Sequence, residues 1–204
     1  MNKFAFALAA TTMAALASPA AAQPAAEDSV TIPITGTAEA FCTLPSTWTF
    51  ASSTSNVSAS QFSGHTWTIP DNLVASTAGN AVVSTAEVAI RVRGQAACNT
   101  THIITLTSAN GGLAHGASAA NPPAGFTRLR RMEYNANWTN ESWGVIGWVP
   151  AAPGDSRTYD HGTRVPPGNH QFDVRMELLR EPTNAPMLAG TYTDQLIITI
   201  SIPS

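Results

Sequence analysis

Charged residues are scarce in this sequence: Asp, Glu, Lys and Arg make up 11% of its 204 residues, and the only lysine is Lys3. The 10 basic residues are balanced by 13 acidic ones, which gives a formal net charge of -3 at pH 7. Nucleic acids and anionic membrane surfaces are bound through concentrated positive charge, so we exclude both as partners. Hydrophobic residues still make up 44% of the chain, so the low charge does not indicate disorder, and we expect one folded domain.

The signatures of catalysis and of metal binding are also absent from the sequence. It contains no G-x-S-x-G elbow and no phosphate-binding glycine loop, and its 5 histidines show neither H-x-H nor H-x-x-x-H spacing. We therefore expect neither an enzyme nor a bound metal or cofactor. No stretch approaches the roughly 18 consecutive apolar residues of a membrane-spanning helix, so we predict no membrane span.

The first 22 residues have the composition of a secretion signal. Lys3 precedes an apolar run over residues 4–17, and small residues after Pro19 end in Ala20-Ala21-Ala22, which matches an A-x-A cleavage site. An N-terminal core helix is the alternative. The pattern favours a signal peptide over residues 1–22 that is removed after export.

Two cysteines, Cys42 and Cys98, lie in the exported part. An even number of cysteines in an oxidising compartment favours a single disulfide, and two free thiols are the alternative. We predict a Cys42–Cys98 bridge.

Short alternating segments separated by Gly, Pro and Asn predict an all-β chain. No segment after the signal has a long helical period, so an antiparallel sandwich is expected. Loop composition covers residues 51–64 and 150–169. The expected strands cover residues 82–93, 102–106, 128–138, 143–149, 172–179 and 192–202. Trp138, Trp143 and Trp148 could form a platform for sugars, but their large area favours packing within the core.

Two segments near the ends of the chain have an apolar face. Near the N-terminus, Val30, Ile32 and Ile34 alternate with polar residues and with Pro33, which restricts this segment to an edge strand or to an unusual setting. Near the C-terminus, the strand expected at 192–202 places Leu196, Ile198, Ile200 and Ile202 on one face.

The most specific pattern is the terminal stretch 189–200, in which Gly-x-Tyr-x-Asp leads into an alternating apolar strand. It occurs together with Cys98-Asn99 ahead of an apolar strand, Asn110-Gly111-Gly112-Leu113, and Tyr134-Asn135 followed by Trp143-Gly144. From about residue 30 to 203, the chain resembles the spore coat protein U domain family. That family includes the archaic-type chaperone–usher pilin subunits of Gram-negative bacteria.

This resemblance implies an immunoglobulin-like antiparallel Greek-key sandwich that lacks its last strand. Residues 38–204 would form the sandwich, and residues 23–37 would form a donor segment. Val30, Ile32 and Ile34 would insert into a neighbouring subunit. The acceptor groove would be lined by Leu196, Ile198, Ile200 and Ile202, and the carboxylate of Ser204 would anchor a chaperone.

The function implied is that of a structural pilus subunit assembled by donor-strand exchange, supporting adhesion or biofilm formation. Its partners would be a periplasmic chaperone, an outer-membrane usher and further pilin copies. It would pass through the periplasm to the cell surface. The alternative is a secreted coat or carbohydrate-binding protein of the same fold, in which the N-terminal strand completes its own sandwich.

Overall fold

The computed structural model describes residues 30–76, 84–86, 88–116, 126, 129–139, 147–162, 164–165, 170–180 and 186–203. The chain divides into two units, residues 1–37 and residues 38–204. In the first unit, residues 30–37 are exposed and belong to no helix or strand.

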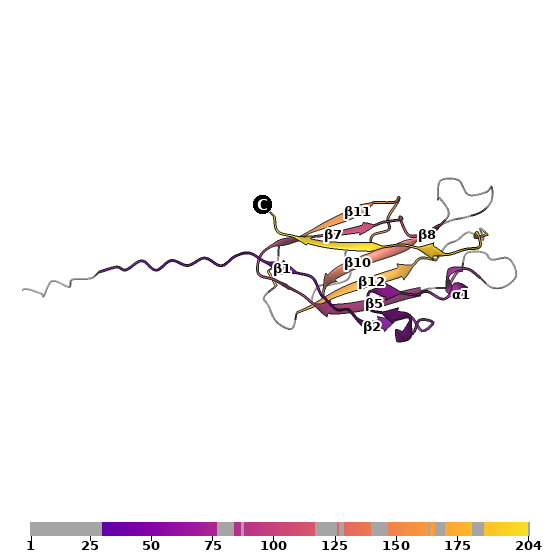
Figure 1. Ribbon diagram of the computed structural model, residues 1–204, viewed down its shortest axis with the longest axis horizontal. Helices are drawn as coiled ribbons and strands as arrows, with labels where there is room; N and C mark the ends of the chain where they lie inside the picture. The colour runs from indigo at the N-terminus through magenta and orange to yellow at the C-terminus, as the bar shows by residue number, and fades with distance from the viewer. Residues whose placement is uncertain are drawn as a thin grey trace, which may run out of the picture. The chain divides into compact units, whose positions relative to one another are not determined.

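The second unit consists mainly of antiparallel strands, which confirms the prediction of an all-β chain. Four strands form the larger sheet, in the order β10 (Met132–Trp138), β12 (Gln171–Leu178), β5 (Val88–Gln95) and β2 (Thr49–Ser53). Three strands form the smaller sheet, in the order β11 (Ser156–His161), β7 (His102–Ser108) and β14 (Leu196–Ser201). Figure 1 shows β11, β7 and β14 above the strands of the larger sheet.

Alternating side chains from both sheets meet in the core. On β7, every second residue from His102 to Ser108 is buried, and on β12 the buried residues include Phe172, Val174 and Leu178. Because side chains of a strand alternate between its two faces, these patterns place one face of each sheet against the other sheet. The remaining fully buried apolar side chains come largely from β5 and β10, among them Val88, Ile90 and Ala136.

Short elements extend the two layers. A further sheet has the order β13 (Tyr192–Thr193), β8 (Leu113–His115) and β9 (Leu129–Arg130). β3 (Phe62–Ser63) pairs with β4 (Thr66–Trp67), and β1 (Cys42–Thr43) pairs with β6 (Ala97–Cys98). The helical turns are η1 (Ala59–Gln61) and α1 (Asp71–Val74).

The predicted disulfide is confirmed: Cys42 and Cys98 are bonded and lie opposite each other in the β1–β6 pair. The bond closes a loop with a sequence separation of 56, worth about 4 kcal/mol if it acts by restricting the unfolded chain. Asn99 adds polar contacts beside it, since its side chain accepts from the Phe41 N–H at 2.8 Å and donates to the Glu39 carbonyl at 2.9 Å.

Four expectations about strands need correction. The single strand predicted at 128–138 is divided into β9 and β10, which belong to different sheets. The loop predicted at 150–169 contains β11, which pairs with β7. The single strand predicted at 192–202 is divided into β13 and β14 by Asp194 and Gln195. Of the loop expected at 51–64, the beginning belongs to β2 and the end to β3. The strand expected at 143–149 falls partly outside the described residues, and Trp148 forms an isolated bridge to Tyr134.

Candidate functional site

The strand β14 is an edge strand whose outer side has no partner strand among the described residues. It pairs with β7 in a register that sets Ile198 opposite Leu106 and Ile197 opposite Thr107. The Ala109 N–H donates to the Gln195 carbonyl at 2.9 Å, so the backbone groups of the odd-numbered residues face β7. Because backbone groups alternate in direction along a strand, those of Leu196, Ile198 and Ile200 face the open edge.

The same three residues turn their side chains inward. Leu196, Ile198 and Ile200 are half-buried against the core, whereas Ile197 and Thr199 between them are exposed. The unpaired backbone groups and the inward apolar side chains of β14 therefore belong to the same residues. An extended segment placed along this edge could form backbone hydrogen bonds and pack apolar side chains at once.

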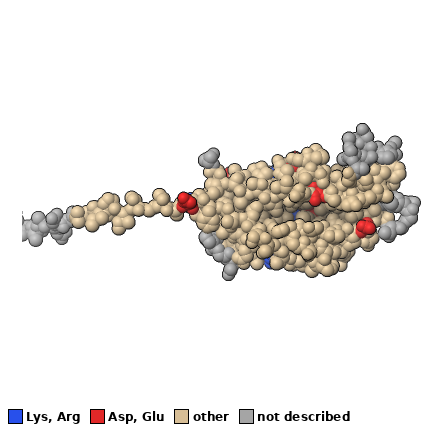
Figure 2. All heavy atoms as spheres, viewed as in Figure 1, with Lys and Arg blue, Asp and Glu red and all other residues tan. Residues whose placement is uncertain are grey.

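A groove lined mostly by apolar residues, with Asp194 and Gln195 among its polar ones, lies beside this edge. Its cavity has a volume of about 600 Å³, with Leu196 and Ile198 of β14 in one wall and Leu44 and Trp48 in the lining from the segment before β2. Figure 2 shows the surface hollowed between the two layers on this face, with few charged side chains around it. The floor comes from the larger sheet and includes Val92, Val174 and Met176.

A close backbone approach positions the segment that carries Leu44 and Trp48. A Cβ atom at Gly94 of β5 would lie 2.3 Å from the Pro45 Cβ and 2.5 Å from the Thr47 carbonyl oxygen. Only glycine permits this crossing. The ring of Trp48 packs edge-on against Phe172, with centroids 6.1 Å apart, which fixes it over the core.

A second cavity, of about 620 Å³, shares lining residues with the first. Trp67, Ile69 and Leu113 line both, and Met187 and Tyr192 are among the residues that line the second alone. The hollow surface therefore continues past the start of β14 along β13.

Asp194, which lies between β13 and β14, is the polar residue at the start of this edge. Its carboxylate accepts hydrogen bonds from the Ser108 hydroxyl at 2.6 Å and from the Tyr134 hydroxyl. It also accepts backbone N–H groups of Asn110 at 2.9 Å and Gly112 at 3.1 Å. Asp194 thus ties the beginning of β14 to the turn after β7 and, through Tyr134, to the opposite sheet.

Tyr134 is held in its neutral form at this position. Its burial, its hydrogen bond to Asp194 and the negative charge of that carboxylate all raise its pKa well above the ordinary value. The hydroxyl therefore remains a hydrogen-bond donor to Asp194 at neutral pH.

The other residues predicted for the groove and for the chaperone anchor do not line the cavity among the described residues. Ile200 packs half-buried against the core but is not among the residues lining the cavity. Ile202 follows the end of β14 and is 39% exposed. Ser204, the predicted chaperone anchor, lies outside the described residues.

The three apolar side chains of the N-terminal segment are exposed. Val30, Ile32 and Ile34 have 85%, 75% and 93% of their surface accessible. Isolated apolar residues are common on protein surfaces, but three on one face of a short extended segment form a continuous apolar strip.

The one metal-like cluster among the described residues has no free ligand. Cys42, Cys98 and His102 approach one another, but both sulfurs are in the disulfide. His102 Nε2 accepts the Trp138 indole N–H at 2.9 Å, so Nδ1 carries the proton and donates to the Thr100 carbonyl at 3.2 Å. This cluster is a packed and hydrogen-bonded part of the core.

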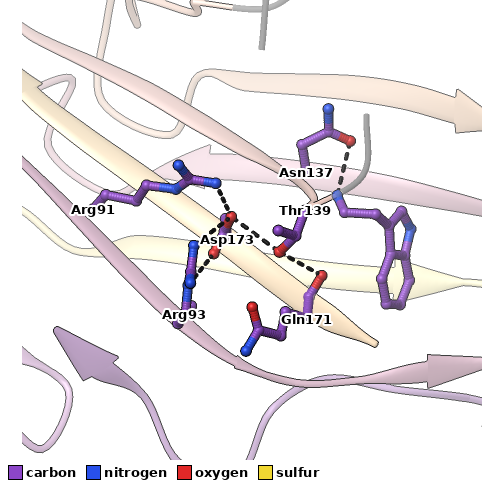
Figure 3. Close-up of polar contacts among 7 residues, drawn as sticks. Arg91, Arg93, Asn137, Thr139, Gln171 and Asp173 are labelled. Carbon is purple, nitrogen blue, oxygen red and sulfur yellow. Dashed lines mark hydrogen bonds and ion pairs between the residues drawn. The ribbon is translucent and has the colours of Figure 1, made fainter. Parts of the chain in front are cut away.

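A fully buried carboxylate, that of Asp173, lies on the outer face of the larger sheet (Figure 3). Asp173 of β12 is fully buried and pairs with Arg91 and Arg93 of β5, with the Arg93 Nε 3.0 Å from Oδ1. The Thr139 hydroxyl is 3.0 Å from Oδ2. These contacts offset the cost of removing the Asp173 charge from water. The burial of this carboxylate is therefore explained by its role in the fold.

Sequence reasoning identified the Gly-x-Tyr-x-Asp motif but not the contacts of its aspartate, and it did not find Asp173. The outward position of Asp173 between Phe172 and Val174, two residues expected to face inward, was an available signal for the latter. Trp138 and Trp148 are buried in the core, as expected from their size, and Trp143 lies outside the described residues.

Comparisons with protein-family models, with curated proteins and with solved structures found no match to this chain. In the described part of the chain, no helix is long and apolar enough to cross a membrane.

Proposed function

We propose that this protein is a structural subunit of a surface pilus. The exported chain, freed of residues 1–22, would fold as an immunoglobulin-like sandwich that lacks its last strand. A periplasmic chaperone would cover the open groove, and an outer-membrane usher would assemble subunits at the cell surface. Each subunit would insert Val30, Ile32 and Ile34 into the groove beside β14 of the next copy.

One observation carries the proposal: the open edge of β14 lies beside an apolar groove and carries neither charge nor proline. Exposed edges of this kind promote aggregation unless another strand pairs with them. Leu196 and Ile198 are half-buried, so the apolar surface of the groove is only partly covered.

The exposed strip of residues 30–34 supplies a suitable occupant. Its three apolar side chains repeat every second residue, as do Leu196, Ile198 and Ile200 on the edge strand. Burying three such side chains contributes on the order of 5–9 kcal/mol before ordering costs. A head-to-tail contact between the N-terminal segment of one copy and the groove of another does not close, so it produces filaments.

The test is the state of the full chain on an unboiled denaturing gel, with Ile34→Arg compared with Thr35→Arg. Position 34 would lie inside the groove and position 35 outside it. We expect a heat-sensitive ladder of multimers from the wild type and from Thr35→Arg, because trapped strand insertion resists detergent. Ile34→Arg should give monomer with an unchanged urea midpoint. A normal ladder from Ile34→Arg would overturn the donor assignment, and a lowered midpoint without multimers would favour the self-completed sandwich.

A further inference from the structure

The β3–β4 hairpin is separate from the two main sheets. Each of its strands has two residues, and in the described part of the chain they pair only with each other. One further backbone bond closes its base, in which the Thr68 N–H donates to the Gln61 carbonyl at 2.8 Å. An isolated two-stranded ribbon is marginally stable in water, so the position of this hairpin depends on the packing of its apolar side chains.

Those side chains are Phe62 and Trp67, which lie opposite each other in the hairpin. Both are half-buried against the core, and both line the cavity of about 600 Å³ beside β14. Leu196 and Ile198 of β14 line the same cavity. A segment inserted along β14 would therefore contact the hairpin as well as the edge strand.

Trp67 holds a buried donor that the fold does not use. Its indole Nε1 is closed off from water and has no hydrogen-bond partner among the described residues. The indole of Trp138 shows the usual arrangement, since its N–H donates to Nε2 of His102 at 2.9 Å. Buried donors are nearly always paired, and an unpaired one lowers stability. Because Trp67 lines both cavities, an occupant of the groove can supply the acceptor.

An added strand brings acceptors of the right kind. The backbone groups of a strand alternate in direction, so a segment paired with β14 directs half of its carbonyl groups to the opposite side. Every residue of the segment 30–34 has such a carbonyl, Pro33 included. The indole N–H is a donor only, so it pairs with a carbonyl and not with a backbone N–H.

We propose that the indole N–H of Trp67 donates to a main-chain carbonyl of residues 30–34 of the neighbouring copy. This bond fixes the β3–β4 hairpin against the inserted strand, on the side that β14 does not reach. The inference rests on the proposed function and adds a residue that binds the segment through its backbone. Trp67 therefore holds the segment whatever its side chains are, whereas Leu196 and Ile198 select apolar ones.

Nuclear magnetic resonance of the full chain tests the bond directly. Ile34→Arg provides a subunit whose own segment is disabled, and a synthetic peptide of residues 29–37 supplies the segment. The indole N–H signal of Trp67 is the one lost in Ile34→Arg/Trp67→Phe. We expect this signal to move to lower field when the peptide binds. A peptide that binds without moving it would overturn the proposal. If the peptide does not bind and the wild type forms no heat-sensitive ladder, the donor contact itself is wrong.

Trp67→Phe also separates this bond from simple packing, because it should act differently on the two states. In the Ile34→Arg background the urea midpoint should not fall, since an unpaired buried donor is removed. In the assembling chain, multimers should decay about three- to tenfold faster in detergent at a fixed temperature, since they lose one hydrogen bond. The matched variant Phe62→Leu removes packing from the same hairpin and should weaken both states together. Multimers of Trp67→Phe that decay at the wild-type rate, or a midpoint lowered as in Phe62→Leu, would contradict the proposal.

Discussion

The two edge strands of the smaller sheet differ in the way they are protected. β11 exposes the charged residues Arg157 and Asp160, and the guanidinium of Arg157 lies over the Tyr159 ring at 5.8 Å from its centroid. β14 contains no charged residue and no proline from Leu196 to Ser201. Charges on an edge discourage pairing with another chain, so β11 is guarded and β14 is left available. Under the proposed function, this one sheet would have a charged edge that resists pairing and an uncharged edge that accepts a strand.

A proline on β14 is expected to have the largest effect on the difference between the two edges. The N–H of Ile198 faces the open edge and that of Thr199 faces β7, so Ile198→Pro removes a docking donor while Thr199→Pro removes a bond of the fold. Ile198→Pro should lower multimers at least tenfold on unboiled gels and cost about 1 kcal/mol of stability, because its ladder bonds to β7 remain. Thr199→Pro should cost about 1–3 kcal/mol in urea unfolding, because it removes a backbone hydrogen bond to β7. A normal ladder from Ile198→Pro would show that the edge is not the docking surface.

The two carboxylates Asp194 and Asp173 extend the comparison, since only Asp194 contacts the residues around the start of β14. Asp194→Asn and Asp173→Asn each turn an amide N–H toward existing donors, so each should lower the free energy of unfolding by about 2–4 kcal/mol. Only Asp194→Asn should also slow multimer formation when both variants are studied below their unfolding midpoints. Equal assembly rates for the two variants would mean that Asp194 does not position β14.

High pH should weaken the tie between β14 and the opposite sheet. The raised pKa of Tyr134 means that the folded state keeps a proton that the unfolded chain loses above its ordinary value near pH 10. Stability is therefore fully present below that pH and falls above it, by at most about 1.4 kcal/mol per pH unit from this group. Urea unfolding between pH 9 and 11 should show a steeper decline in the wild type than in Tyr134→Phe. Parallel declines would contradict the role of this hydroxyl.

The smallest effect is expected on the guarded edge. Replacing the β11 charges in Arg157→Thr/Asp160→Thr should change the free energy of unfolding by about 0.5 kcal/mol or less, because both side chains are exposed. It should instead produce slow, irregular association visible by light scattering in a chain that also carries Ile34→Arg. Unchanged scattering would show that these charges do not protect the edge.

Alternation in the sequence predicted strands in which apolar residues recur at inward positions, such as Ile104 and Leu106 of β7, Phe172 and Val174 of β12, and the apolar residues of β14. It missed β11, because Ser156–His161 has polar outward residues and lies in a stretch rich in Pro and Gly. The wall formed by Leu44 and Trp48 could not be predicted, since it depends on the close approach of Pro45 to Gly94 on a distant strand. The division of the strand expected at 192–202 into β13 and β14 could not be predicted either. A polar residue such as Asp194 followed by alternating apolar residues also fits one continuous strand.

The contacts of Asn99 have a mechanical consequence. Its side chain holds Glu39 and Phe41 just before Cys42, whose disulfide joins the segment to β6. A pulling force applied to residue 37 would first load these hydrogen bonds and then a covalent bond. The force would reach β6 before it could peel the Leu44 and Trp48 segment from β5. The groove wall is therefore isolated from tension transmitted along the chain.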